Sequence, residues 1–344
     1  MTPSTPISAS AEPGAPLLTV RDLRIETRDR SPAALIENVS FDIRAGETLA
    51  LVGESGAGKS LSALAILGLL PPDAMRVTGG EIRLGAQSLS DISPRQLRKV
   101  RGGRVAMIFQ DPLGCLNPVL TVGRQITEAL HLHKGLRGAA ARRRAVELLD
   151  LVRIPEAEKR LDEYPHRLSG GMRQRVMIAI ALAGDPSLLL ADEPTTALDV
   201  TISTQIIELL RQLQKDIGLS ILMITHDLPA VRMIADRVAV MYSGRIVETG
   251  AAEDIFAAPR HPYTRGLLSA RPRGAIATGA ERLTEIPGTV PQPSRRPSGC
   301  AFRPRCPRAT ALCAAEIPAI RPAGGSLTAC HHADGLTETR ARAS

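Results

Sequence analysis

The octapeptide GESGAGKS at residues 53–60 decides the fold, because it fits the phosphate-binding pattern GxxxxGK[ST]. It lies between the apolar run ETLALVG (47–53), expected as a strand, and the apolar segment 59–70, expected as a helix. Glycines let such a loop wrap phosphate groups, so that its N–H groups point inward at a helix N-terminus. We therefore expect this loop to bind a nucleoside triphosphate. The residues concerned are Gly53, Glu54, Ser55, Gly56, Ala57, Gly58, Lys59 and Ser60.

An acidic pair is expected to complete the nucleotide site. The stretch SLLLADEP (187–194) places Asp192 and Glu193 at the end of an apolar strand, where α/β sheets gather their functional groups. In such a site Lys59 reaches the β- and γ-phosphates, and the Ser60 hydroxyl binds Mg²⁺. Asp192 is expected to hold the same Mg²⁺, directly or through water, and Glu193 to polarise the attacking water. Outside this context, the two carboxylates could equally serve as capping or ion-pairing groups.

Hydrophobic periodicity predicts an α/β fold. Alternating apolar positions at 17–25 and 35–43 predict antiparallel strands in an N-terminal β subdomain. Further along, apolar strands alternate with helices, which favours a mainly parallel core sheet buried on both faces. Those strands are expected at 47–53, 104–109, 187–192 and 219–225, with a closing hairpin at 237–250. Polar helical sequence from about 111 to 185 is expected to form an inserted helical subdomain.

Composition suggests where this domain ends. The chain has 344 residues, 44% of them hydrophobic, which suits one large or two smaller globular domains. Residues 1–16 are expected to be a disordered leader, and residues 17–258 the nucleotide-binding domain. From residue 259 on, proline and arginine dominate, which predicts a separate appendage with little regular structure over 259–335. Residues 336–344 are expected to be a disordered tail.

Several classes of protein are disfavoured. No apolar run reaches the 18 or so residues that cross a bilayer, and the N-terminus lacks the basic and apolar pattern of a secretory signal. From residue 251 on, 13 arginines, no lysine and 7 acidic residues carry +6 of the total charge of +8. This basic segment could contact phosphates or an anionic surface, or could simply be solvated. With no tryptophan and only seven phenylalanine and tyrosine residues, we expect no nucleic-acid partner.

A second motif narrows the class of nucleotide-binding protein. Residues 168–172 read LSGGM and are followed by Arg-Gln-Arg. This resembles the LSGGQ signature of the ATP-binding-cassette (ABC) family, with methionine in place of the last glutamine. The resemblance extends to Gln110 in the Q-loop position, the sequence Ala-Leu-Asp at 197–199 in the D-loop position and His226 after the strand SILMIT. These motifs follow the order of the family and span residues 17–250.

The resemblance implies a composite active site. In the ABC family two cassettes face each other head to tail, so Ser169, Gly170 and Gly171 would contact the γ-phosphate of ATP held by the partner. A helix N-terminus that bears Ser-Gly-Gly is a good anion clamp. By the same resemblance Asp199 belongs to the ATP site, and His226 would orient the γ-phosphate and the water. Gln110 would link Mg²⁺ to a membrane partner.

Three further stretches resemble one branch of the family. DPLGCLNP after Gln110, HPYTRGLL at 261–268 and CAFRPRCPRATALC at 300–313 are similar to the D-type ATPase subunits of bacterial dipeptide and oligopeptide importers. That resemblance implies a homologous F-type ATPase as partner, two transmembrane permease subunits and, indirectly, a substrate-binding protein. It places the chain peripherally on the cytoplasmic face of the inner membrane. Nickel importers share parts of the pattern, so a nickel or other small solute is an alternative substrate.

The cysteines near the C-terminus suggest a metal site. Cys300, Cys306, Cys313 and Cys330 follow the spacing C-x5-C-x6-C-x16-C, which lacks the closely paired ligands of a zinc ribbon. Four thiolates on an irregular loop can hold an iron–sulfur cluster, and the family resemblance implies a [4Fe–4S] cluster here. Zn²⁺, with His331 and His332 nearby, and free thiols remain alternatives. Cys115 stands apart from the group.

Two further alternatives concern function and base selectivity. A soluble ABC ATPase acting on ribosomes or DNA would be consistent with the net positive charge of the chain. However, the chain has neither the tandem cassettes nor the long coiled-coil insertion that such proteins usually carry. Residues 27–36 also lack the aromatic residue on which the family usually stacks adenine, so Leu35, Arg28 or Arg30 would have to take its place. GTP is therefore expected to be used almost as well as ATP.

Overall fold

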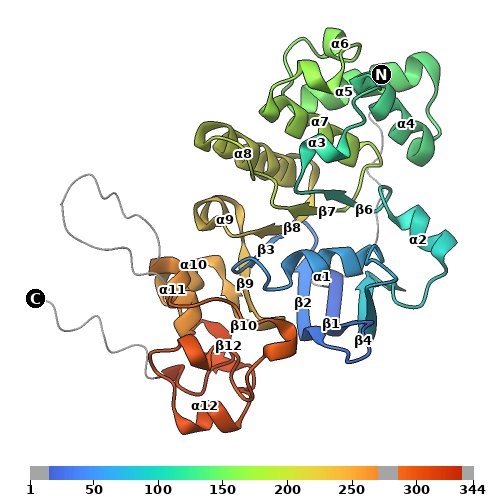
Figure 1. Ribbon diagram of the computed structural model, residues 1–344. Coiled ribbons are helices and arrows are strands. Elements are labelled where there is room, and N and C mark those ends of the chain that lie inside the picture. Colours follow the sequence, from blue (N-terminus) through green and yellow to red (C-terminus); the bar gives the residue numbers. More distant parts are fainter. Residues whose placement is uncertain (1–14, 270–285, 335–344) are drawn as a thin grey trace, which may run out of the picture.

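The computed structural model describes residues 15–269 and 286–334, and Figure 1 shows how their elements are arranged. The predicted tail (336–344) and residues 1–14 of the predicted leader lie outside the described residues. Pro16, which we assigned to the leader, instead begins the first strand. No helix in the described ranges combines the length and the apolar character that crossing a membrane requires.

An antiparallel sheet forms the N-terminal part of the molecule. Its strand order is β2-β1-β4-β5, and β1 pairs with β2 in antiparallel register, as the alternating pattern predicted. Strand β4 follows helix α1 and was missed, because its sequence does not alternate cleanly. The elements are β1 (Pro16–Thr27), β2 (Ala34–Arg44), β4 (Met75–Leu84) and β5 (Gln87–Ser88), with the short helix α2 (Pro94–Val100) after them.

A second sheet carries the core, with the strand order β11-β12-β10-β9-β3-β8-β7-β6. The five neighbouring strands β9, β3, β8, β7 and β6 run parallel to one another. All residues of β3, β7 and β8 are buried, as predicted for a sheet covered on both faces. The bounds are β3 (Thr48–Val52), β6 (Val105–Ile108), β7 (Leu188–Asp192), β8 (Ser220–Thr225), β9 (Arg237–Tyr242) and β10 (Arg245–Ala251).

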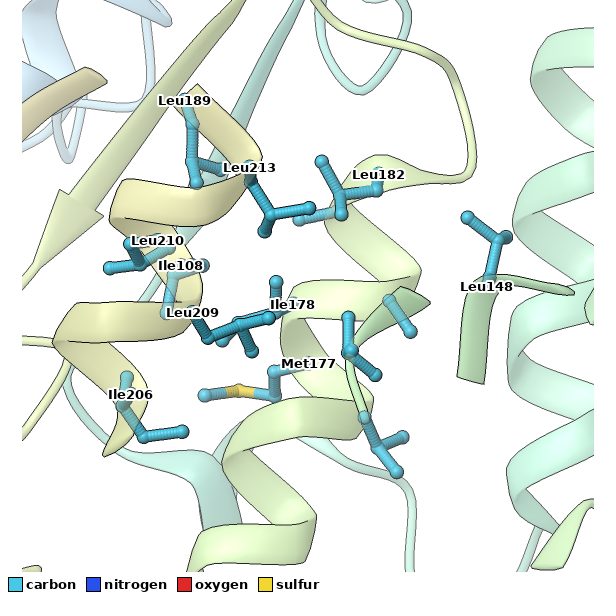
Figure 2. Close-up of a cluster of buried hydrophobic side chains, with 14 of the residues drawn as sticks. Ile108, Leu148, Met177, Ile178, Leu182, Leu189, Ile206, Leu209, Leu210 and Leu213 are labelled. Carbon is cyan, nitrogen blue, oxygen red and sulfur yellow. The ribbon is translucent and has the colours of Figure 1, made fainter. Parts of the chain in front are cut away.

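Helices connect these strands and build a helical arm beyond the β6 edge of the sheet (Figure 1). Helix α8 joins the arm to the sheet, since its apolar face packs against α7. Figure 2 shows Leu209, Leu210 and Leu213 of α8 opposite Met177 and Ile178 of α7 in this shared core. The bounds are α1 (Lys59–Ile66), α3 (Pro112–Cys115), α4 (Val122–Lys134), α5 (Gly138–Leu151), α6 (Ala157–Arg160), η1 (Pro165–Arg167), α7 (Gly170–Leu182), α8 (Val200–Ile217) and α9 (Leu228–Ile234).

The C-terminal extension is more regular, and more closely joined to the sheet, than the sequence suggested. Strand β12 pairs with β10 and so continues the main sheet, which corrects our expectation of a separate, irregular appendage. Phe302 and Tyr263 of the extension share a buried cluster with Tyr242 of β9. The elements are α10 (Ala252–Ala257), α11 (Pro262–Ser269), η2 (Pro293–Arg295), η3 (Arg303–Arg305), α12 (Ala311–Ala315), β11 (Arg321–Ala323) and β12 (Ser326–Thr328).

Candidate nucleotide site

The glycine-rich loop 53–60 joins the C-terminal end of β3 to the N-terminus of α1. Gly58 caps the helix with a φ of +102°, and a β-carbon there would collide with the Ile36 side chain, so the position requires glycine. Lys59, only 6% exposed, turns back into the loop and donates hydrogen bonds from Nζ to the carbonyls of Gly53 (2.8 Å) and Glu54 (3.1 Å). Burial lowers the pKa of this ammonium group, while the nearby carboxylates of Glu193, Asp192 and Glu54 act in the opposite direction.

Ser60 and Asp192 meet at the base of the loop. The Ser60 hydroxyl donates a 2.9 Å hydrogen bond to Oδ1 of Asp192, although the two residues lie 132 positions apart. They meet because β7, which ends at Asp192, is separated from β3 by a single strand, β8. Burial raises the pKa of the Asp192 carboxyl, and the hydrogen bond from Ser60 opposes that shift. A hydroxyl and a carboxylate held together in this way are the oxygen ligands that Mg²⁺ prefers.

Glu193 follows directly and is held at both carboxylate oxygens. Oε1 lies 2.8 Å from Nδ1 of His226, and Oε2 accepts a 2.7 Å hydrogen bond from the Thr196 hydroxyl. Its backbone has a φ of +50°, an unusual conformation for a residue with a side chain. The Glu193 side chain is 12% exposed and that of His226 is 67% exposed. Two hydrogen-bonding side chains therefore orient a carboxylate that is mostly buried.

A cleft of about 760 Å³ lies beside Glu193 and the start of the glycine-rich loop. Gly53 and Glu54 line one side of it, and Glu193 and His226 line another. The N-terminal end of α8 and the beginning of α9 complete the wall. Of the residues that we expected near one another, Glu193 and His226 line this cleft, whereas Asp192 contacts Ser60 outside its lining.

The residues of the LSGGM motif lie elsewhere. Ser169 caps helix α7, and its hydroxyl accepts a hydrogen bond from the Met172 N–H. Ser169 and Gly170 are exposed, whereas Gly171 is buried against Ile202 of α8. Within the described ranges, no hydrogen bond joins residues 169–171 to the loop 53–60. The N-terminus of α7 is therefore exposed at Ser169 and Gly170.

Two further predicted site residues, Asp199 and Gln110, are exposed. Asp199 caps α8, and its carboxylate accepts a 2.9 Å hydrogen bond from the Ile202 N–H. Gln110 lies two residues beyond the end of β6. Among the residues that the structure describes, no hydrogen bond links it to Ser60 or Asp192.

Comparison with known proteins assigns the family. Residues 36–196 match the model of the ABC transporter family, and residues 247–313 match that of the oligopeptide/dipeptide transporter C-terminal region. A Brucella abortus protein named for peptide import and ATP binding is 53% identical over 92% of this chain and 95% of its own length. The chain belongs to the ABC transporter family of ATP-binding proteins. It is an ATPase, and membership of this family implies ATP and Mg²⁺ as its ligands.

Other relatives and solved structures agree with this assignment. The dipeptide transport ATP-binding protein DppD of Escherichia coli is 50% identical over 92% of this chain and 96% of its own. The oligopeptide transport ATP-binding protein AppD of Bacillus subtilis is 50% identical over 88% and 92%. The dimeric cassette MJ0796, bound to ADP and Pi, matches with a TM-score of 0.61 and 28% identity over 68% of this chain and 98% of its own.

The four C-terminal cysteines of this ABC protein line one small pocket with His331 and His332. All five cysteines of the chain are free thiols. Burial, with a smaller contribution from the other three thiols, raises the pKa of Cys330 to about 11. Within the two described ranges, however, no three histidine, cysteine, aspartate or glutamate side chains form a group that could hold a single metal ion.

The sequence analysis missed two side chains that contact the nucleotide loop and one that contacts the carboxylate of Glu193. The Tyr263 hydroxyl and the Arg305 guanidinium, both from the extension, contact Glu54. The Thr196 hydroxyl contacts Glu193. Tyr263 lies in the HPYT segment, which the sequence singled out only as a family resemblance. For Arg305, one of 13 arginines after residue 250, the sequence offers no signal.

Thr196→Val is expected to lower kcat by roughly tenfold with little change in KM for ATP. Valine keeps the shape of the side chain but removes the hydroxyl that orients Glu193, a contact in the range of 1–2 kcal/mol. Steady-state hydrolysis measures the effect, and Thr201→Val, an exposed change on α8, serves as the control. Equal kcat values for the two variants would show that Thr196 does not position the base.

Proposed function

We propose that this chain is the ATP-hydrolysing subunit of an importer of dipeptides or oligopeptides. The observation that carries the proposal is the 50–53% identity, over about nine-tenths of the chain, with proteins named for peptide import, dipeptide transport and oligopeptide transport. The match of residues 247–313 to the C-terminal region of such transporters supports it independently of the nucleotide site. A nickel or other small-solute importer is less well supported, because no feature of the structure favours it.

Within the site, each side chain is proposed to have one task. Lys59 exchanges its two backbone carbonyls for the β- and γ-phosphates, since both carbonyls lie at the mouth of the same loop. Ser60 and Asp192 hold the Mg²⁺, which neutralises phosphate charge. Glu193 accepts the proton of the attacking water, and His226 keeps the carboxylate and the γ-phosphate in register. Gln110 would join the Mg²⁺ shell after the site closes.

The second half of the site is proposed to come from another cassette. Ser169 and Gly170 are exposed at the N-terminus of α7, and Asp199 lies exposed between Leu198 and Val200, which line the cleft. Two cassettes arranged head to tail would bring the N-terminus of α7 to the γ-phosphate of the partner. By family resemblance the second cassette is a homologous F-type subunit, so the dimer is heteromeric.

A second groove, separate from the nucleotide cleft, is proposed to receive the permease. It is lined by Leu67 and Leu69 after α1, by Phe109 beside Gln110, and by Met177 of α7. Leu69 and Phe109 are more than a third exposed, so an apolar helix end of a permease would bury surface that is now in water. The contact would couple Gln110 to transport. Two permease subunits and a substrate-binding protein complete the proposed importer, with this chain on the cytoplasmic face of the inner membrane.

The four C-terminal cysteines are proposed to hold a [4Fe–4S] cluster within a domain covering residues 259–335. A zinc ion, with Zn–S bonds of about 2.3 Å, would draw four sulfurs to within about 4 Å of one another. The support for the cluster is that all four thiols line one small pocket and that their spacing lacks the closely paired ligands of a zinc ribbon. When bound, the cluster would cross-link the extension.

Anaerobically purified protein is therefore expected to contain iron and sulfide and to absorb near about 400 nm, with loss of this band on reduction. Cys306→Ser should remove the band, whereas Cys115→Ser, at the exposed cysteine outside the pocket, should retain it. Stoichiometric zinc with no iron would contradict the cluster.

Purification from membranes tests the import function most simply. The tagged chain is expected to copurify with two permease chains and a second cassette, and cells carrying Lys59→Ala should lose uptake of labelled di- or tripeptides. Recovery with ribosomes or DNA would instead support the soluble ABC ATPase. Uptake of nickel but not of peptides would support the alternative substrate.

A further inference from the structure

Glu54, the second residue of the nucleotide loop, is held at three points. Its N–H donates a 2.8 Å hydrogen bond to the hydroxyl of Tyr263, and its carbonyl accepts from Nζ of Lys59. Its carboxylate pairs with the Arg305 guanidinium, where Nη1 and Oε2 lie 2.9 Å apart. Two of these three partners come from the C-terminal extension, more than 200 residues away along the chain.

Arg305 is built into the extension rather than lying on its surface. Its side chain is only 6% exposed and lies beside the rings of Tyr242 and Phe302. Two further hydrogen bonds run from its guanidinium to the backbone carbonyls of Pro287 and Ile286. These contacts direct one edge of the group at Glu54. Tyr263 is fully buried beside it, and burial raises the pKa of its phenol, so it stays neutral.

The charge of Glu54 creates an electrostatic problem for a triphosphate site. The carboxylate is adjacent to the loop that receives a polyanion, and its Oε1 is buried without a hydrogen-bond partner. Like charges repel more strongly in a partly desolvated pocket than in water, because the local dielectric is lower. An arginine that is always protonated removes most of this repulsion without competing for the phosphates.

We propose that Arg305 is a positioning residue of the nucleotide site, which neutralises and orients Glu54 so that the loop binds ATP tightly. Tyr263 assists by holding the Glu54 backbone. The extension therefore forms the outer wall of the nucleotide loop in addition to any role of its cysteines. This inference rests on the proposed nucleotide site, and it assigns to the extension a part in ATP affinity.

Arg305→Met is expected to raise the Kd for a fluorescent ATP analogue, and the KM for ATP, by roughly tenfold, with kcat within about twofold of wild type. A structural defect would instead lower the amount of active protein and therefore the apparent kcat. Arg305→Gln, which removes the charge but keeps a donor for the Pro287 carbonyl, gives a second readout should the methionine variant not fold. Arg303→Met, in the same turn, is the control matched for net charge.

The deciding measurement is a double variant. If Arg305 acts through the Glu54 charge, Glu54→Gln combined with Arg305→Met should bind ATP within about twofold of Glu54→Gln alone. A double variant that stays as weak as Arg305→Met, or an Arg305→Met protein that binds like wild type, would overturn the inference. The Lys59→Ala variant distinguishes failure of this inference from failure of the proposed nucleotide site. If Lys59→Ala bound ATP as tightly as wild type, both the site and the inference would be wrong.

Discussion

Glu193→Gln is expected to lower kcat for ATP hydrolysis by about 10²–10⁴-fold while ATP stays bound. Glutamine keeps the size of the side chain and can still bond to Thr196 and His226, but it cannot accept the proton of the attacking water. Binding groups such as Lys59 and Ser60 are untouched, so the affinity for ATP should not fall. Single-turnover hydrolysis together with equilibrium nucleotide binding measures the two effects separately.

Because Glu193→Gln binds ATP but hydrolyses it slowly, the ATP-bound state of the variant should accumulate. If ATP joins two cassettes and its hydrolysis separates them, Glu193→Gln should trap the closed pair. Glu253→Gln, an exposed change on α10, is the matched control and should behave as wild type. Hydrolysis at the original rate by Glu193→Gln would show that another group is the base.

The second large effect is expected at the N-terminus of α7. Ser169→Asp keeps a good helix cap for the Met172 N–H, so the stability of the helix should not change. It places a negative charge where the partner's γ-phosphate is proposed to lie, and losing one such clamp costs about 10²-fold in rate. Hydrolysis at the partner's site should fall by at least that factor, while this chain's own loop still binds ATP.

Thr121→Asp provides the comparison for that variant. Thr121 caps α4 through the Arg124 N–H, so the same chemistry is tested at a helix N-terminus without a proposed ligand. The ATPase activity and the melting temperature of the Thr121→Asp variant should both stay near those of wild type. Full activity of the assembled transporter with Ser169→Asp would contradict the composite site.

Local sequence signals predicted the core of this molecule well. Strands β3, β7 and β8 were expected because their apolar runs are short and end in polar or glycine residues. Parallel strands gather their carboxyl ends at one edge, so the convergence of Ser60 with Asp192 could be anticipated. The capping roles of Ser169 and Asp199 agree with their positions before apolar helices.

Contacts between distant segments could not be predicted in the same way. The pairing of β12 with β10 involves three-residue matches that leave no periodic pattern. Arg305 reaches Glu54 because a buried aromatic cluster holds the extension against β9, and no local motif records that packing. The pocket shared by the cysteines likewise depends on where β12 returns Cys330 to the group.

In the proposed arrangement, one chain binds ATP and a second cassette completes the site. Sedimentation of the Glu193→Gln cassette together with its copurified partner cassette, with and without ATP, is the decisive experiment. A two-cassette species should form only with ATP and should be lost on adding Ser169→Asp. An ATP-bound monomer of 36.6 kDa, with wild-type chain hydrolysing ATP at full rate in that form, would contradict it.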